Sequence, residues 1–89
     1  MMRKIFSSPQ FEKKLVRFLQ KNPEYEKKIK IVFKLLEKDI RHPTLKTHRL
    51  HGKLSFLFSC SIAYQYRLAF SSDSKFIYPH AIGSHDDVY

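Results

Sequence analysis

The pattern of apolar and polar residues predicts two helices in the first half of the chain. Apolar side chains recur at helical spacing over residues 9–22 and again over residues 23–40, with lysines on the opposite face of the second segment. Ser8 and Asn22 precede these segments, and each is followed by proline, a combination typical of helix starts. The sequence therefore predicts two adjacent amphipathic helices joined by a short turn.

The second half of the chain has the two-residue period of strands. Apolar and polar residues alternate over residues 54–62 and 64–70, after a basic loop at residues 41–49. A third strand is expected at residues 76–82, where Pro79 fits an edge or a bulge better than a regular central strand. Three consecutive strands joined by short turns favour antiparallel pairing.

A short strand candidate at Arg3–Phe6 completes the order β-α-α-β-β-β over residues 1–89. We expect one domain of the α+β class, with an antiparallel sheet that carries the N-terminal helical hairpin on one face. The apolar fraction of 43% is sufficient for a hydrophobic core, so a disordered chain is not expected.

Composition narrows the setting of the protein. The single cysteine cannot form a disulfide within the chain and fits a reducing cytosol. The longest apolar stretch, residues 54–60, is far too short to span a bilayer. The sequence therefore predicts a cytoplasmic protein that makes no membrane contact.

Positive charge is concentrated in one half of the molecule. Residues 1–51 hold 14 basic and 5 acidic side chains, which accounts for the whole net charge of +9, whereas residues 52–89 hold three of each. Such a field favours a polyanionic partner, because neutralising phosphates releases condensed counterions. Nucleic acid and an acidic protein both satisfy this expectation.

Histidine is the residue type with the clearest chemical potential. Five histidines occur in 89 residues, and imidazole can take or give a proton near neutral pH. A metal-free ribonuclease needs such groups and a cation, because the 2′-OH of the RNA itself attacks the phosphate. Arg67 is a candidate for that cation and should emerge from the more polar face of its strand. The alternatives are ordinary structural histidines and an Arg67 ion pair. Histidine spacing matches no standard zinc site, so we expect no metal and no cofactor.

Three segments resemble the RelE/ParE superfamily of toxins. The sequence Ile-Gly-Ser-His-Asp-Asp-Val-Tyr at residues 82–89 resembles the ending of YafQ-type members. His-Arg-Leu-His-Gly at residues 48–52 is similar to the His-x-Leu-x-Gly that precedes a strand in these toxins. Tyr-Arg-Leu-Ala-Phe at residues 66–70 resembles the RelE strand whose arginine contacts the scissile phosphate.

The resemblance implies the toxin of a type II toxin–antitoxin system, a ribosome-dependent endoribonuclease that cuts mRNA in the A site. It further implies a co-encoded acidic antitoxin bound in a hetero-oligomer. By position, His85 and His48 would be the acid–base pair, Arg67 would stabilise the phosphate, and Tyr89 would position the substrate. Further residues expected to contact the substrate are His51, Lys46, Arg49 and Lys53.

Departures from the YafQ pattern keep alternatives open. YafQ-type toxins carry a further histidine and an Asp-Trp pair where this chain has Ser61, Gln65 and Tyr66. The general base and general acid are therefore not assigned from the sequence. A ParE-like toxin that inhibits DNA gyrase without catalysis, and an inactive binding module on the same scaffold, remain the other interpretations.

Overall fold

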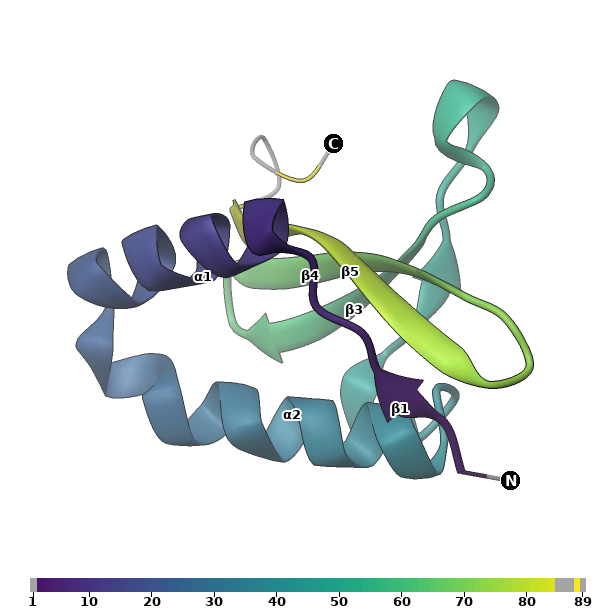
Figure 1. Ribbon diagram of the computed structural model, residues 1–89, viewed down its shortest axis with the longest axis horizontal. Helices are drawn as coiled ribbons and strands as arrows, with labels where there is room; N and C mark the ends of the chain where they lie inside the picture. The colour runs from purple at the N-terminus through teal and green to yellow at the C-terminus, as the bar shows by residue number, and fades with distance from the viewer. Residues whose placement is uncertain (1, 85–87, 89) are drawn as a thin grey trace.

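The computed structural model describes residues 2–84 and 88, and residues 2–84 form two α-helices and a five-stranded sheet (Figure 1). The α-helices and strands are β1 (Lys4–Ile5), α1 (Pro9–Lys21), α2 (Glu26–Lys38), β2 (His48–Arg49), β3 (Phe58–Ala63), β4 (Tyr66–Ser72) and β5 (Phe76–Ser84). Three 3-10 turns lie between them: η1 (Pro23–Tyr25), η2 (Pro43–Leu45) and η3 (Gly52–Leu54). The predicted α+β class and β-α-α-β-β-β order are confirmed, with β2 as an additional short strand inside the expected loop.

The sheet has the order β1-β5-β4-β3-β2. Strands β2 to β5 pair antiparallel with their neighbours, as expected, but β1 pairs parallel to β5. The amide of Phe6 donates to the carbonyl of Ile77 at 2.8 Å within this pairing. The sheet is therefore mixed rather than wholly antiparallel, because the pattern of a two-residue edge strand carries no information on its direction.

The helix starts follow the sequence at one position and depart from it at the other. Ser8 caps α1 as predicted, with its Oγ accepting a hydrogen bond from the Phe11 amide at 3.1 Å. Asn22 does not cap the second helix, because its side chain is used elsewhere. Its Nδ2 donates to the Phe18 carbonyl at 3.0 Å, and its Oδ1 accepts from the Tyr66 hydroxyl at 3.2 Å. The chain makes the turn η1 before α2 begins.

The strand expected from residue 54 begins only at Phe58. Leu50 and Leu57 are both buried, and the Leu50 amide donates to the Leu57 carbonyl at 2.9 Å, which closes the intervening segment into a loop. Gly52 permits the turn with φ +68°, a left-handed conformation that costs glycine little. The alternation in this segment thus reflects packing of a loop rather than strand pairing.

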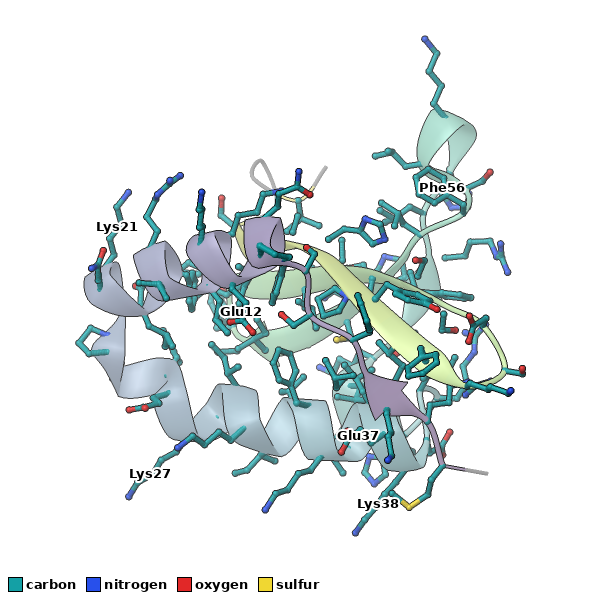
Figure 2. All side chains as sticks on the ribbon, in the orientation of Figure 1. Glu12, Lys21, Lys27, Glu37, Lys38 and Phe56 are labelled. Atoms are coloured by element: carbon teal, nitrogen blue, oxygen red, sulfur yellow. The ribbon has the colours of Figure 1, made fainter. Side chains whose placement is uncertain are left out.

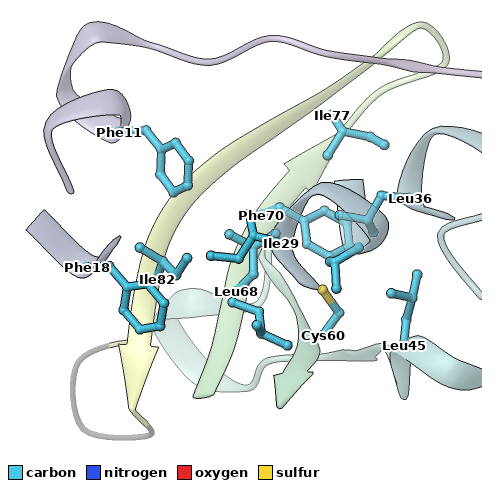
Figure 3. Close-up of a cluster of buried hydrophobic side chains, with 12 residues drawn as sticks. Phe11, Phe18, Ile29, Leu36, Leu45, Cys60, Leu68, Phe70, Ile77 and Ile82 are labelled. Carbon is cyan, nitrogen blue, oxygen red and sulfur yellow. The ribbon is translucent and has the colours of Figure 1, made fainter. Parts of the chain in front are cut away.

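The main core lies between the two helices and one face of the sheet (Figure 3). Phe11 and Phe18 of α1 and Leu36 of α2 meet Leu68 and Phe70 of β4 there, so both predicted helical stripes are buried as expected. A smaller cluster occupies the other face of the sheet and consists of Leu50, Leu57, Ala69 and Val88. The described residues contain no helix long and apolar enough to cross a membrane.

Pro79 lies at a bulge, one of the two settings predicted for it. Ala69 is paired with Ala81, but the next residue of β4, Phe70, is paired with Pro79. His80 is therefore the extra residue of β5, without a partner on β4. Bulges of this kind redirect side chains and often lie beside functional sites.

We expect Leu36→Ala to lower the free energy of unfolding by about 2–5 kcal/mol, since it leaves a cavity in a fully buried site. Ile31→Ala is the matched control on the outer side of the same helix, where Ile31 is 53% exposed, and should change it by less than about 0.5 kcal/mol. Urea unfolding followed by circular dichroism measures both. Equal losses in the two variants would contradict the buried face assigned to α2.

Candidate functional site

The side chains of β4 alternate between the two faces of the sheet. Leu68 and Phe70 point into the main core beneath the helices, whereas Ala69 belongs to the smaller cluster on the other side. Arg67 is two residues before Ala69 on the same strand, so its side chain lies on the same side of the sheet as that of Ala69. We call this side the Arg67 face. Arg67 thus emerges away from the helices, on the more polar face that the alternation predicted.

The Arg67 guanidinium joins three segments of the chain. Its Nε donates to the Oγ of Ser59 at 2.5 Å, and Ser59 is fully buried. Its Nη2 donates to the Lys46 carbonyl at 3.2 Å and lies 3.4 Å from Nδ1 of His48. Lys46 has φ 50°, an uncommon conformation for a non-glycine residue. These contacts fix the guanidinium in one orientation at the surface.

His48 reaches Arg67 through the pairing of β2 with β3. Its register partner is Ser59, so both side chains lie on the Arg67 face. Arginine has only donors, so the contact with Arg67 makes Nδ1 of His48 the acceptor. In the neutral ring the proton then resides on Nε2. Nε2 of His48 can therefore donate a hydrogen bond, whereas general acid catalysis would require the imidazolium form of the ring.

The other residues predicted to bind substrate are distributed around this centre. Arg49 is paired with Phe58, so its side chain lies toward the other face; the guanidinium carbon is 4.8 Å from the Phe58 ring centroid, and Nη1 donates to the Ser55 carbonyl at 2.8 Å. His51 and Lys53 are exposed, at the start of η3. His85 and Tyr89 lie outside the described residues. The structure therefore brings together Arg67, His48 and Lys46, and it separates Arg49 from them.

Two cavities are lined by cations, and the first of them adjoins this centre. One of about 390 Å³ contains side chains from Lys28, Lys46 and Arg67, together with the hydroxyl residues Ser61 and Thr44. None of its lining residues is acidic, which suits an anionic group such as phosphate.

The second cavity, of about 520 Å³, is lined by Lys14, Arg17 and Lys21 of α1 and reaches Gly83 and Ser84 at the end of β5. Figure 2 shows Lys21 extending outward from α1. The sequence predicted that the helices are basic but did not distinguish these three cations, because other basic residues lie among them on the same faces.

His80 is a further polar group that the sequence did not assign to the site. Its Nε2 lies 2.9 Å from the Oγ of Ser71, at the end of β4. Partial burial, with a smaller effect of the positive charge of Lys14, lowers the pKa of His80 from its usual value. The sequence signals were the histidine itself, one of five candidates for proton transfer, and Pro79, since the bulge that it predicted determines where His80 points.

Cys60 is the single cysteine of the chain, and it is buried. Burial raises the pKa of the Cys60 thiol to about 12, with Arg67 opposing the shift, so the nucleophilic thiolate is scarce. Residues 2–84 and 88 contain no group of three histidine, cysteine, aspartate or glutamate side chains placed to hold a metal ion.

Comparisons with known proteins identify the fold. No protein-family model and no curated protein matches the chain, but solved structures do so over nearly its whole length. The chain shares its fold with solved YafQ and YoeB toxins, which confirms at the level of fold the resemblance expected from the sequence.

Particular toxins show how similar the structures are. YafQ from Escherichia coli strain BL21(DE3) has a TM-score of 0.81 at 21% identity, covering 98% of each chain. The E. coli DinJ–YafQ toxin–antitoxin complex matches with a TM-score of 0.79 at 22% identity, over 100% of this chain and 99% of that one. The YoeB dimer from Staphylococcus aureus matches with 0.73 at 25% identity, over 96% and 99%.

We expect Lys14→Ala to raise the pKa of His80 toward its usual value, since a nearby positive charge is removed and the hydrogen bond from Lys14 Nζ that anchors the His80 backbone is lost. NMR titration of the imidazole C–H signals, assigned with His80→Gln, measures this change. The native pKa lies below the unfolded one, so the native state binds fewer protons and loses stability as pH falls through 6.5 toward the native pKa. A His80 pKa at or above 6.5 in the native protein would contradict the described surroundings.

Proposed function

We propose that this protein is the toxin of a type II toxin–antitoxin system and acts as a ribosome-dependent endoribonuclease on mRNA in the A site. The observation that carries the proposal is the Arg67 guanidinium, fixed on the exposed side of the sheet with His48 at 3.4 Å. The RelE/ParE-like fold, shared with YafQ and YoeB toxins, supports the same class.

The proposed reaction uses the 2′-OH of the RNA as the nucleophile and no metal. A base removes the 2′ proton while the oxygen attacks the adjacent phosphorus, and the bond from phosphorus to the 5′ oxygen breaks. An acid returns a proton to that leaving oxygen. The products carry a 2′,3′-cyclic phosphate and a 5′-OH. The protein has to supply a base, an acid and a cation that stabilises the pentavalent phosphate.

Arg67 is the proposed cation. Its contacts with Ser59, Lys46 and His48 use Nε and Nη2, and within the described residues Nη1 makes no hydrogen bond. That group can donate to a phosphate oxygen without rearrangement of the others, which favours a preorganised site. The cavity beside Arg67 is lined by Lys28 and Lys46, whose positive charges would attract the neighbouring phosphates of the RNA backbone.

Proton transfer is assigned to two histidines. His48 is the proposed acid and acts from its imidazolium form, in which Nδ1 also carries a proton and no longer accepts from Nη2 of Arg67. His85 is the proposed base; it follows Ser84 at the end of β5, two residues beyond Gly83, the register partner of Arg67. Tyr89 is proposed to stack on or position the substrate, as the terminal aromatic of YafQ-type toxins does.

The proposed partners follow from charge and from the related structures. The net charge of +9 suits an acidic antitoxin as well as ribosomal RNA. DinJ–YafQ and YoeB–YefM are solved as toxin–antitoxin complexes, which supports a hetero-oligomer for this chain too. Action on translating ribosomes implies that the protein works in the cytoplasm.

We expect Arg67→Ala to slow cleavage by about 10²–10³-fold, because the positive charge that stabilises the pentavalent phosphate is lost. His85→Ala should slow it by about 10²–10⁴-fold, through loss of proton transfer. Mapping new mRNA 5′ ends in a reconstituted translation reaction measures both. The wild type should cut within translating codons only when ribosomes are present. Lys75→Ala, an exposed cation at the far end of β5, should cut as the wild type does.

Circular dichroism and antitoxin binding show whether each variant is folded. A double variant Arg67→Ala/His85→Ala that cuts at the wild-type rate would exclude the proposed site. No cuts from folded wild-type protein would exclude the nuclease itself, and DNA supercoiling by gyrase would then test the ParE-like alternative.

A further inference from the structure

Two aromatic side chains on the Arg67 face have no role in the proposed reaction. Phe56 follows η3, and Figure 2 shows it on the segment that projects away from the sheet. Its side chain is 58% exposed. The imidazole of His80 meets it edge to face, with ring centroids 6.2 Å apart and an interplanar angle of 83°. A single exposed phenylalanine is ordinary on a protein surface. Phe56 differs because its ring contacts a hydrogen-bonded imidazole on the Arg67 face.

The bulge in β5 places His80 at this position. His80 is the extra residue between the Ala69–Ala81 and Phe70–Pro79 pairs. Its Nε2 lies 2.9 Å from the Oγ of Ser71. Ser71 lies on the same side of β4 as Arg67 and Ala69. The bulge therefore adds a polar ring to the face that carries the proposed catalytic groups.

Other contacts fix the backbone and Nε2 of His80 and leave Nδ1 able to bind a ligand. Nζ of Lys14 donates to the His80 carbonyl at 2.9 Å, so α1 anchors the backbone of the bulge. Within the described residues, Nδ1 of His80 makes no hydrogen bond, whereas Nε2 is engaged by Ser71. A cavity of about 500 Å³ adjoins the ring and is lined in part by Lys14, Ser71 and His80. The pair thus offers an exposed aromatic surface, a polar ring atom and a nearby cation.

We propose that Phe56 and His80 form a binding subsite for one nucleobase of single-stranded RNA, next to the scissile phosphate. The base stacks on the exposed face of Phe56, and Nδ1 of His80 hydrogen-bonds its edge. This inference rests on the proposed function and adds a determinant of sequence preference to it. His80 precedes Gly83, the partner of Arg67, by three residues, a separation of about 10 Å along β5. The subsite therefore serves a nucleotide that flanks the one attacked.

Direct binding tests the subsite separately from catalysis. The probes are fluorescein-labelled 2′-O-methyl RNA pentanucleotides, which cannot be cleaved, with one abasic position moved along the strand. Fluorescence anisotropy should show that Phe56→Ala weakens binding of the intact probe about tenfold, as expected for one lost stacking contact. In one position of the probe, the abasic site should weaken binding by the wild type about as much as Phe56→Ala weakens binding of the intact probe. The same abasic site should not weaken binding by Phe56→Ala any further.

Matched variants separate stacking from general effects. Phe56→Tyr keeps the ring and should bind like the wild type, whereas Phe56→Leu keeps the apolar volume and should bind like Phe56→Ala. Ile31→Ala, which removes an exposed apolar side chain from α2, should bind normally. Equal binding by wild type and Phe56→Ala, or equal loss from every abasic position in both proteins, would overturn the subsite.

Cleavage provides the second readout. In the reconstituted translation reaction, Phe56→Ala and His80→Ala should still cut at saturating mRNA, with KM raised severalfold and the preference for one codon position flattened. Wild-type protein that binds the probes through Phe56 but never cuts would exclude the proposed nuclease and keep the subsite. Variants that cut with unchanged KM and preference would overturn the subsite and keep the nuclease.

Discussion

The arrangement of the proposed site depends on the hydrogen bonds of Arg67. A guanidinium on β4 binds a buried hydroxyl on β3, a carbonyl at the end of η2 and the ring of His48 on β2. A buried hydroxyl such as that of Ser59 is costly unless it is hydrogen-bonded, and Arg67 provides one of its contacts. Satisfying Ser59 and Lys46 also fixes the direction of the remaining N–H groups of Arg67. The same contacts that stabilise the loop after α2 therefore preorganise a cation on the exposed face of the sheet.

The division of the sheet into two faces explains why this site stays accessible. Both helices cover one side, where large apolar residues such as Phe11, Leu36 and Phe70 are buried. Among residues 2–84 and 88, the other side carries a small apolar cluster around Ala69, with hydroxyl, imidazole and guanidinium groups on either side of it. A sheet with one buried and one largely polar face presents functional groups at fixed spacing on a rigid support, which binding and catalysis require.

Periodicity was sufficient to predict most of the fold. The helical stripes, the Ser8 cap and the bulge at Pro79 follow from local chemistry that the sequence displays. The loop of residues 50–57 did not, because the alternation suggested that Phe56 faces inward, whereas Phe56 is 58% exposed and Leu57 is buried instead. For the site, strand alternation predicted the face of Arg67, but Lys28 and His80 join it through tertiary contacts that leave no mark on a single sequence. Arg49, which sequence placed with the substrate, is paired in register with Phe58 and points the other way.

The central claim is that Arg67 and its neighbours assist attack by the RNA's own 2′-OH. The most direct measurement is cleavage of an mRNA that carries a single 2′-deoxynucleotide at a mapped cut position, programmed in the ribosomal A site. The account predicts that this substitution abolishes cutting at that position and that the unmodified mRNA yields a 2′,3′-cyclic phosphate end. Cutting of the deoxy-substituted mRNA at an undiminished rate would contradict it, because the nucleophile would then have to come from elsewhere.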